Sequence, residues 1–135
     1  MAETTITDRA TRNVELFTKG YAAFGAGDLQ TVEAMFEPDA VWHAQRLGTL
    51  SGDHAGWPAV LGFFGRTMEL SGGTFRVAVQ EIMANDDGAA VVVRSTAERN
   101  GKQLDSRQVH LYRVRGDRVV EAWQFAGPEA DDFWS

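Results

Sequence analysis

The chain has 135 residues, of which 44% are hydrophobic and 24% charged, and this length predicts one domain, residues 1–135, with a substantial core. The net charge of −6 argues against a nucleic-acid partner, which needs clustered basic residues, and the lack of cysteine excludes disulfides and thiolate chemistry. No segment approaches the roughly 20 apolar residues of a membrane helix, and residues 1–13 are too polar for a secretory signal, so we expect a cytoplasmic protein without a membrane partner.

The first half of the chain has the apolar spacing of helices. Thr7 or Asp8 can cap a first helix that runs to Phe24 and ends at the glycines of residues 25–27. Asp28 can then cap a short second helix, which Pro38 would close. These segments predict a helical hairpin.

A third helix is predicted after a short strand at residues 40–43 and a polar connection. Pro58 lies in its first turn, where the missing N–H costs nothing, and the helix should end near residues 71–73. Its large apolar side chains follow one stripe.

From Thr74 onward the apolar spacing changes to a period of two. One strand should lead to a turn at residues 85–88, and a second, residues 89–99, leads into an Asn-Gly hairpin. The stretch 100–127 then contains two further strands joined by a Gly-Asp turn, with His110 in the middle of the first. Helices followed by strands indicate an α+β fold. The tail, residues 128–135, ends on Phe133 and Trp134, which we expect to pack against the rest of the molecule.

Three segments together resemble the SnoaL-like branch of the nuclear-transport-factor-2-like superfamily. They are YAAFGAGDLQTVEAMFEPDAVWH, the helix GxxxGWPAVLGFF and the hairpin end RGDRVVEAWQF, and the likeness spans about residues 10–127. It implies a cone-shaped, cystatin-like α+β barrel in which three N-terminal helices pack on a curved, mostly antiparallel sheet. A pocket would lie between the two layers. The resemblance does not imply one reaction, because this fold supports isomerases, cyclases, dehydratases, epoxide hydrolases and non-catalytic binders.

The functional positions of these families match the chain only in part. In enzymes similar to limonene-epoxide hydrolases the arginine matches Arg94, but the two carboxylates match Thr96 and Gln124. In ketosteroid-isomerase-like enzymes the base matches Ala44 and the oxyanion donor matches His110. SnoaL-type cyclases place a histidine fourteen residues before a carboxylate, a spacing that here joins His110 to Gln124. The histidine is therefore present where relatives have one, and the carboxylates are not.

The resemblance also predicts the two faces of the sheet. Arg94, Thr96, Gln108, His110, Tyr112, Ala122 and Gln124 should face the pocket, and Val109, Leu111, Trp123 and Phe125 should form an apolar outer face. We expect a homodimer through that outer face. A regular two-residue turn at residues 100–101 would instead pair Arg94 with Arg107, and only a bulge in the ladder would keep Arg94 in the pocket.

The candidate catalytic residues are His110, as acid, base or oxyanion donor, and Arg94. Arg94 either holds a ligand oxygen or pairs with Asp105 or Glu98. The candidate ligand-binding residues are Phe17, Tyr21, Trp42, Trp57, Phe63, Phe64, Met68, Thr96, Gln108, Tyr112 and Gln124. No cofactor and no metal site are expected, since His43 and His54, placed near the pocket rim, lack a ligand motif.

Three functions stay open. The first is a cofactor-independent isomerase, cyclase or dehydratase that acts by acid–base chemistry on a hydrophobic cyclic or polyketide-like substrate. The second is a non-catalytic binding protein for such a molecule. The third is a structural dimerisation module, which predicts a filled cone without a cavity.

Overall fold

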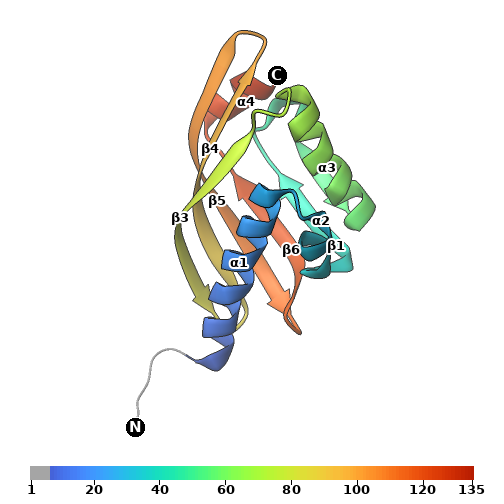
Figure 1. Cartoon of the computed structure of the whole chain (residues 1–135), viewed down its shortest axis with the longest axis vertical. Coiled ribbons are helices and arrows are strands. Elements are labelled where there is room, and N and C mark those ends of the chain that lie inside the picture. The colour runs from blue at the N-terminus through green and yellow to red at the C-terminus, as the bar shows by residue number, and fades with distance from the viewer. Residues whose placement is uncertain (1–6) are drawn as a thin grey trace.

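A computed structural model describes residues 7–135, in which four α-helices cover one six-stranded sheet (Figure 1). The elements in chain order are α1 (Asp8–Ala26), α2 (Leu29–Ala34), β1 (Phe36–Ala44), a 3₁₀ turn η1 (Gly48–Leu50), β2 (Gly52–Ala55), α3 (Trp57–Leu70), β3 (Arg76–Asn85), β4 (Gly88–Arg99), β5 (Lys102–Arg115), β6 (Arg118–Phe125) and α4 (Pro128–Trp134). The α+β class is confirmed. Residues 1–6, on which the absence of a secretory signal partly rests, lie outside the described residues.

The helix starts follow the capping signals of the sequence. The Thr7 side chain accepts a hydrogen bond from Ala10 N at 3.1 Å, and that of Asp28 accepts one from Thr31 N at 3.2 Å. Helix α1 continues through Gly25 and ends only at Gly27, whose φ of 76° is the left-handed C-cap conformation that glycine adopts without strain.

Strand β1 is longer than predicted. Helix α2 ends at Ala34, and Phe36 already belongs to the strand, so Pro38 does not close the helix. The pairing of β1 with β6 is irregular between Phe36 and Val41. Pro38 lies within that interruption, where its missing N–H breaks no ladder hydrogen bond.

The sheet has the order β2-β1-β6-β5-β4-β3. Among the strands of residues 7–135, only the pairing of β1 with β6 is parallel, so the expected mostly antiparallel sheet is confirmed. Strand β2 was predicted as a polar connection, because its four residues, GDHA, have neither apolar alternation nor length. It becomes a strand by pairing with β1 at the sheet edge.

The β4–β5 hairpin is regular. Arg94 pairs with Arg107, Thr96 pairs with Asp105, and no bulge interrupts the ladder. Because side chains alternate along a strand, Arg94 and Thr96 share the outer face with Asp105. Val93, Ser95 and every second residue of β4 in phase with them face the core. The predicted pocket placement of Arg94 and Thr96 is therefore wrong.

The tail packs as expected, and it does so as a fourth helix. Phe133 and Trp134 of α4 are buried. Two hydrogen bonds join this helix to the rest of the protein. Gly48 N in η1 donates to Asp131 Oδ1 at 2.8 Å, and the Arg99 side chain in β4 donates to the carbonyl of Phe133 at 3.0 Å. Within residues 7–135, no helix has the length and apolar character needed to cross a membrane.

Candidate functional site

A pocket lies between the concave face of the sheet and the helices. The volume that the centres of water molecules can occupy in this pocket is about 70 Å³. Because one water needs roughly 10–15 Å³ on this measure, the pocket can hold several. Its wall is mostly aromatic and aliphatic, and none of the residues lining it is Asp, Glu, Lys or Arg. This cavity contradicts the filled cone that a purely structural module predicts.

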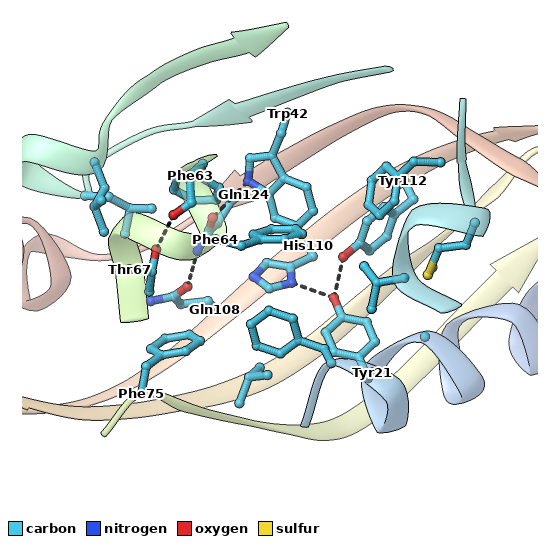
Figure 2. Close-up of a pocket in the computed structure, with 18 of the residues that line it drawn as sticks. Tyr21, Trp42, Phe63, Phe64, Thr67, Phe75, Gln108, His110, Tyr112 and Gln124 are labelled. Atoms are coloured by element: carbon cyan, nitrogen blue, oxygen red, sulfur yellow. Dashed lines mark hydrogen bonds between the residues drawn. The ribbon is translucent and has the colours of Figure 1, made fainter. Parts of the chain in front are cut away.

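A hydrogen-bonded cluster of three ring side chains stands at the centre of the pocket. His110 and Tyr112 lie two apart on β5 and so face the same side, and Tyr21 reaches them from α1 (Figure 2). The hydroxyl oxygen of Tyr21 lies 2.5 Å from His110 Nδ1 and 2.5 Å from the hydroxyl oxygen of Tyr112. The other ring nitrogen of His110, Nε2, is buried and has no hydrogen-bond partner among residues 7–135. The cluster therefore presents one unused polar atom in an apolar cavity.

Burial keeps all three groups uncharged near neutral pH. Desolvation lowers the pKa of His110 to about 4, because the imidazolium ion loses its hydration. Desolvation likewise raises the pKa of Tyr21 and of Tyr112 above the usual value for a phenol. The site thus holds a neutral imidazole and two neutral phenols.

A second polar chain leads from the pocket to the surface. Trp42 Nε1 donates to Gln124 Oε1 at 3.0 Å, and Gln124 Nε2 donates to Gln108 Oε1 at 2.8 Å. Gln108 Nε2 then donates to Ser106 Oγ at 3.4 Å, and Ser106 donates to Glu129 Oε2 at 2.6 Å. The two glutamines are held in fixed orientations by this chain.

The glutamines and His110 share one part of the pocket. Gln124 is the cross-strand partner of His110, and Gln108 lies two residues before it on β5. Figure 2 shows the imidazole with one nitrogen turned to Tyr21 and the other toward the side where Gln108 and Gln124 lie. Trp42 closes this region with its indole 5.5 Å from the His110 ring, edge to face.

The structure brings eight of the predicted site residues together in the pocket wall. They are Tyr21, Trp42, Phe63, Phe64, Gln108, His110, Tyr112 and Gln124. Their roles toward a ligand stay predictions.

Five predicted residues lie outside the wall. Phe17 packs behind it with its ring 4.3 Å from that of Tyr112, and Trp57 packs on Phe36 at 5.4 Å. In α3 the helical phase turns Thr67 to the pocket, so that its neighbour Met68 does not line it.

Arg94, with Thr96, lies on the outer face of the sheet. Its Nε donates to Asp105 Oδ1 at 2.7 Å, which is the internal pairing that the sequence left open. The ion pair raises the pKa of Arg94 and lowers that of Asp105. Arg94 cannot reach a ligand in the pocket.

Several residues of the wall were not selected from the sequence. They include Phe24, Phe36, Leu47, Leu50, Thr67, Phe75, Val77 and Trp134. Phe24 had a usable signal, since it follows Tyr21 by three positions on the same helix face. Trp134 was expected to pack against the rest of the molecule, but nothing in the sequence showed that the docking of α4 would bring it to the pocket.

The other two histidines lie outside the pocket wall. His43 is on the outer face, where its Nδ1 is 2.7 Å from Asp53 Oδ1 and its Nε2 is 2.6 Å from Glu121 Oε2. Hydrogen bonding to Asp53, then to Glu121, raises the pKa of His43. His54 stacks on Phe63 at 4.5 Å. Among the described residues, no group of three or more potential ligands has the geometry of a metal site.

Comparisons with known proteins agree with this architecture. The family model of the SnoaL-like domain matches residues 17–122. An uncharacterized protein of Mycobacterium tuberculosis is 33% identical over 126 residues, 91% of this chain and 96% of that protein. The structure of Bal32a, from a soil-derived mobile gene cassette, has a TM-score of 0.89 at 34% identity and covers 95% of this chain and 100% of its own. A Jannaschia protein assigned as a SnoaL-like polyketide cyclase has a TM-score of 0.77 at 18% identity, covers 92% of this chain and 91% of its own, and shows the fold alone.

Proposed function

The chain belongs to the SnoaL-like family of the nuclear-transport-factor-2-like superfamily, and from this premise we propose that its pocket takes up a compact, hydrophobic, ring-containing molecule on which His110 acts. The reaction would be a cofactor-independent isomerisation, cyclisation or dehydration of a cyclic or polyketide-like substrate. The Jannaschia protein, which has the same fold, is assigned to the polyketide cyclases.

The unpaired Nε2 atom of His110 carries this proposal. A buried polar atom that nothing pairs with costs about 1–3 kcal/mol, and among residues 7–135 no group pairs with His110 Nε2, which borders the apolar cavity. A ligand with a polar atom at that point would remove the cost. Aromatic rings around the cavity favour an apolar ring as the body of the ligand.

Thermal-shift titration with one- and two-ring compounds that carry a single oxygen function tests the proposal. We expect a compound that raises the melting temperature of the wild type and of His54→Gln, a histidine variant outside the pocket wall, and raises that of His110→Leu much less. A folded wild type that responds to no compound, and that carries no co-purified small molecule in native mass spectrometry, would contradict the proposal.

A non-catalytic binding protein is the second candidate. The observation that favours it is the composition of the wall, which contains no carboxylate that could abstract a proton. The two candidates differ in the fate of the ligand. If mass spectrometry finds a bound compound unchanged after long incubation with the wild type, the protein is a binder. Conversion by the wild type that His110→Leu abolishes identifies an enzyme.

A further inference from the structure

We infer that the pocket presents hydrogen-bond donors to its ligand, so that the ligand is an acceptor, a ring ketone or the enolate derived from it, and that Tyr21 is the positioning residue that makes His110 a donor. This inference rests on the proposed function, because it names the chemical class that the same pocket would select.

The first step is a count of protons in the cluster of Tyr112, Tyr21 and His110. Burial keeps both phenols protonated and the imidazole neutral, so the three groups carry three protons, one each. In one arrangement Tyr112 donates to Tyr21 and Tyr21 donates to His110 Nδ1. The imidazole proton is then on Nε2, and only this N–H lacks a partner.

The reverse arrangement leaves more groups unpaired. If Nδ1–H donates to Tyr21, the Tyr21 hydroxyl can donate to Tyr112, whose own O–H then has no acceptor among the contacts of the described residues. Alternatively Tyr21 accepts from both groups, and its own O–H then has no acceptor among those contacts. His110 Nε2 remains unpaired as well. One additional buried donor without a partner disfavours this arrangement. The first arrangement therefore holds, with Nε2–H as a donor.

The second polar chain has a direction that its two ends determine. An indole N–H only donates, and an ionised carboxylate only accepts, so the chain runs from Trp42 to Glu129. The Ser106 hydrogen bond lowers the pKa of Glu129 and so keeps this end ionised. Each glutamine oxygen between the ends already accepts one hydrogen bond.

The hydrogens left without an acceptor are therefore on N–H groups, whereas each hydroxyl and amide oxygen of the two polar chains already takes part in at least one hydrogen bond. Besides Nε2–H of His110, the amide groups of Gln124 and Gln108 each have a second N–H, for which the described residues supply no acceptor. A carbonyl or enolate oxygen satisfies such donors and brings no proton that needs an acceptor. An alcohol on the same ring brings a hydroxyl proton that must find its own acceptor in the pocket, and this makes it the weaker ligand.

Nitrogen-15 NMR of the ligand-free protein tests the His110 assignment directly. Long-range proton–nitrogen correlations distinguish a protonated Nε2 from a protonated Nδ1, and the His110 signals are identified by their loss in His110→Gln. We expect the Nε2–H form in the wild type. The Nδ1–H form would overturn the inference and would leave the proposed binding of a ring compound intact.

Two tyrosine variants separate positioning from packing. Tyr21→Phe removes the donor to Nδ1 and should shift His110 from the Nε2–H form toward a mixture of both forms. Tyr112→Phe keeps the Tyr21 donor and should leave the Nε2–H form in place. A Tyr21→Phe variant with an unchanged Nε2–H signal would show that Tyr21 does not position the proton.

The ligand class is tested with a matched pair, 1-indanone and 1-indanol, which differ in a ketone and an alcohol on one ring system. The ketone should bind the wild type at least about tenfold more tightly, the factor that one unpaired buried group produces. In His110→Leu this preference should shrink. Equal or tighter binding of 1-indanol overturns the acceptor assignment alone. If neither compound binds, the acceptor assignment fails. If, in addition, none of the one- and two-ring compounds of the thermal-shift titration binds, the proposed function fails as well.

Discussion

His110 and His43 lie on opposite faces of one sheet, and their surroundings shift their pKa in opposite directions. His110 is buried among uncharged side chains, and this burial lowers its pKa to about 4. His43 bridges Asp53 and Glu121, so hydrogen bonds to carboxylates raise its pKa. The pH dependence of stability should therefore have opposite signs for these two residues.

For His110 we predict a loss of stability on acidification. Between its unfolded pKa of about 6.5 and its folded pKa of about 4, the unfolded chain binds a proton that the folded protein excludes. The free energy of unfolding of the wild type, relative to His110→Gln, should fall by up to roughly 3 kcal/mol from pH 7 to pH 4. Urea unfolding at several pH values measures this. A difference independent of pH would mean that the folded protein does not exclude the proton.

For His43 we predict a loss of stability on the alkaline side. Its folded pKa is raised, so its contribution is complete below about pH 6.5 and disappears as the pH rises through the folded value. The wild type should exceed His43→Gln in stability at pH 6 by more than at pH 8.5, again by urea unfolding. The opposite trend would indicate that the imidazole is neutral between its two carboxylates.

The residues of the site were partly predictable. His110, Gln108, Tyr112 and Gln124 were placed in the pocket by family likeness, and they line it because alternation along β5 keeps residues 108, 110 and 112 on one face and Gln124 pairs with His110. Arg94 was assigned from family likeness, although the two-residue turn already paired it with Arg107 on the outer face. Strand parity, a physical constraint, was the better guide there than the matched position.

At the scale of elements, close backbone contacts decide which glycines can be replaced. A Cβ on Gly88 would overlap the carbonyl oxygen of Tyr112 on the neighbouring strand, whereas a Cβ on Gly62 in α3 meets nothing within 4 Å. Gly88 thus lets β4 approach the backbone of the strand that carries His110. Gly62 only weakens its helix.

This difference gives a matched pair of variants. Gly62→Ala should raise the free energy of unfolding by up to about 1 kcal/mol, the helix propensity gained. Gly88→Ala should lower it by about 1–3 kcal/mol, because one strand must shift to admit the methyl group. Urea unfolding of both variants at one pH measures the pair. A Gly88→Ala protein as stable as the wild type would show that the strands have room to separate.

Elements with their own periodicity or caps were predictable, and elements made by tertiary contacts were not. Helix α1 and strands β4–β6 have apolar spacings that persist over several turns or residue pairs. Strand β2 has four residues and exists through its pairing with β1. Helix α4 has seven residues, too few for independent stability, and depends on the burial of Phe133 and Trp134.

At the scale of the whole molecule, the outer face of the sheet carries two adjacent rows of apolar residues across several strands. We call these rows the outer-face stripe: Val92, Val109 and Phe125 in one row, and Met83, Ala90, Leu111 and Trp123 in the other. Arg94 and Arg107 border the stripe on one side, and Arg113 and Glu121 on the other. Such a pattern, apolar in the centre and charged at the rim, is typical of an interface between subunits.

We predict that the outer-face stripe joins two copies of the chain. Met83 is 51% exposed, Leu111 41% and Phe125 45%, an unusual concentration of large apolar side chains on one sheet face. A two-fold axis would place the stripe against itself and cover these residues in both copies at once. Sedimentation velocity should therefore give a dimer for the wild type at micromolar concentration.

Phe125→Lys should convert that dimer to a monomer, because it places a charge in the apolar centre. Leu29→Lys is the matched control, since Leu29 is 43% exposed but belongs to α2 on the helical side of the sheet. The control should stay dimeric, and both variants should keep the thermal unfolding transition of a folded protein. A monomeric wild type, or a dimer that Phe125→Lys leaves intact, would contradict the prediction that the outer-face stripe joins two copies of the chain. Selective loss of the dimer in Phe125→Lys would place the subunit contact on the face opposite the pocket, so that two pockets open away from each other and each takes up its ligand without crossing the interface.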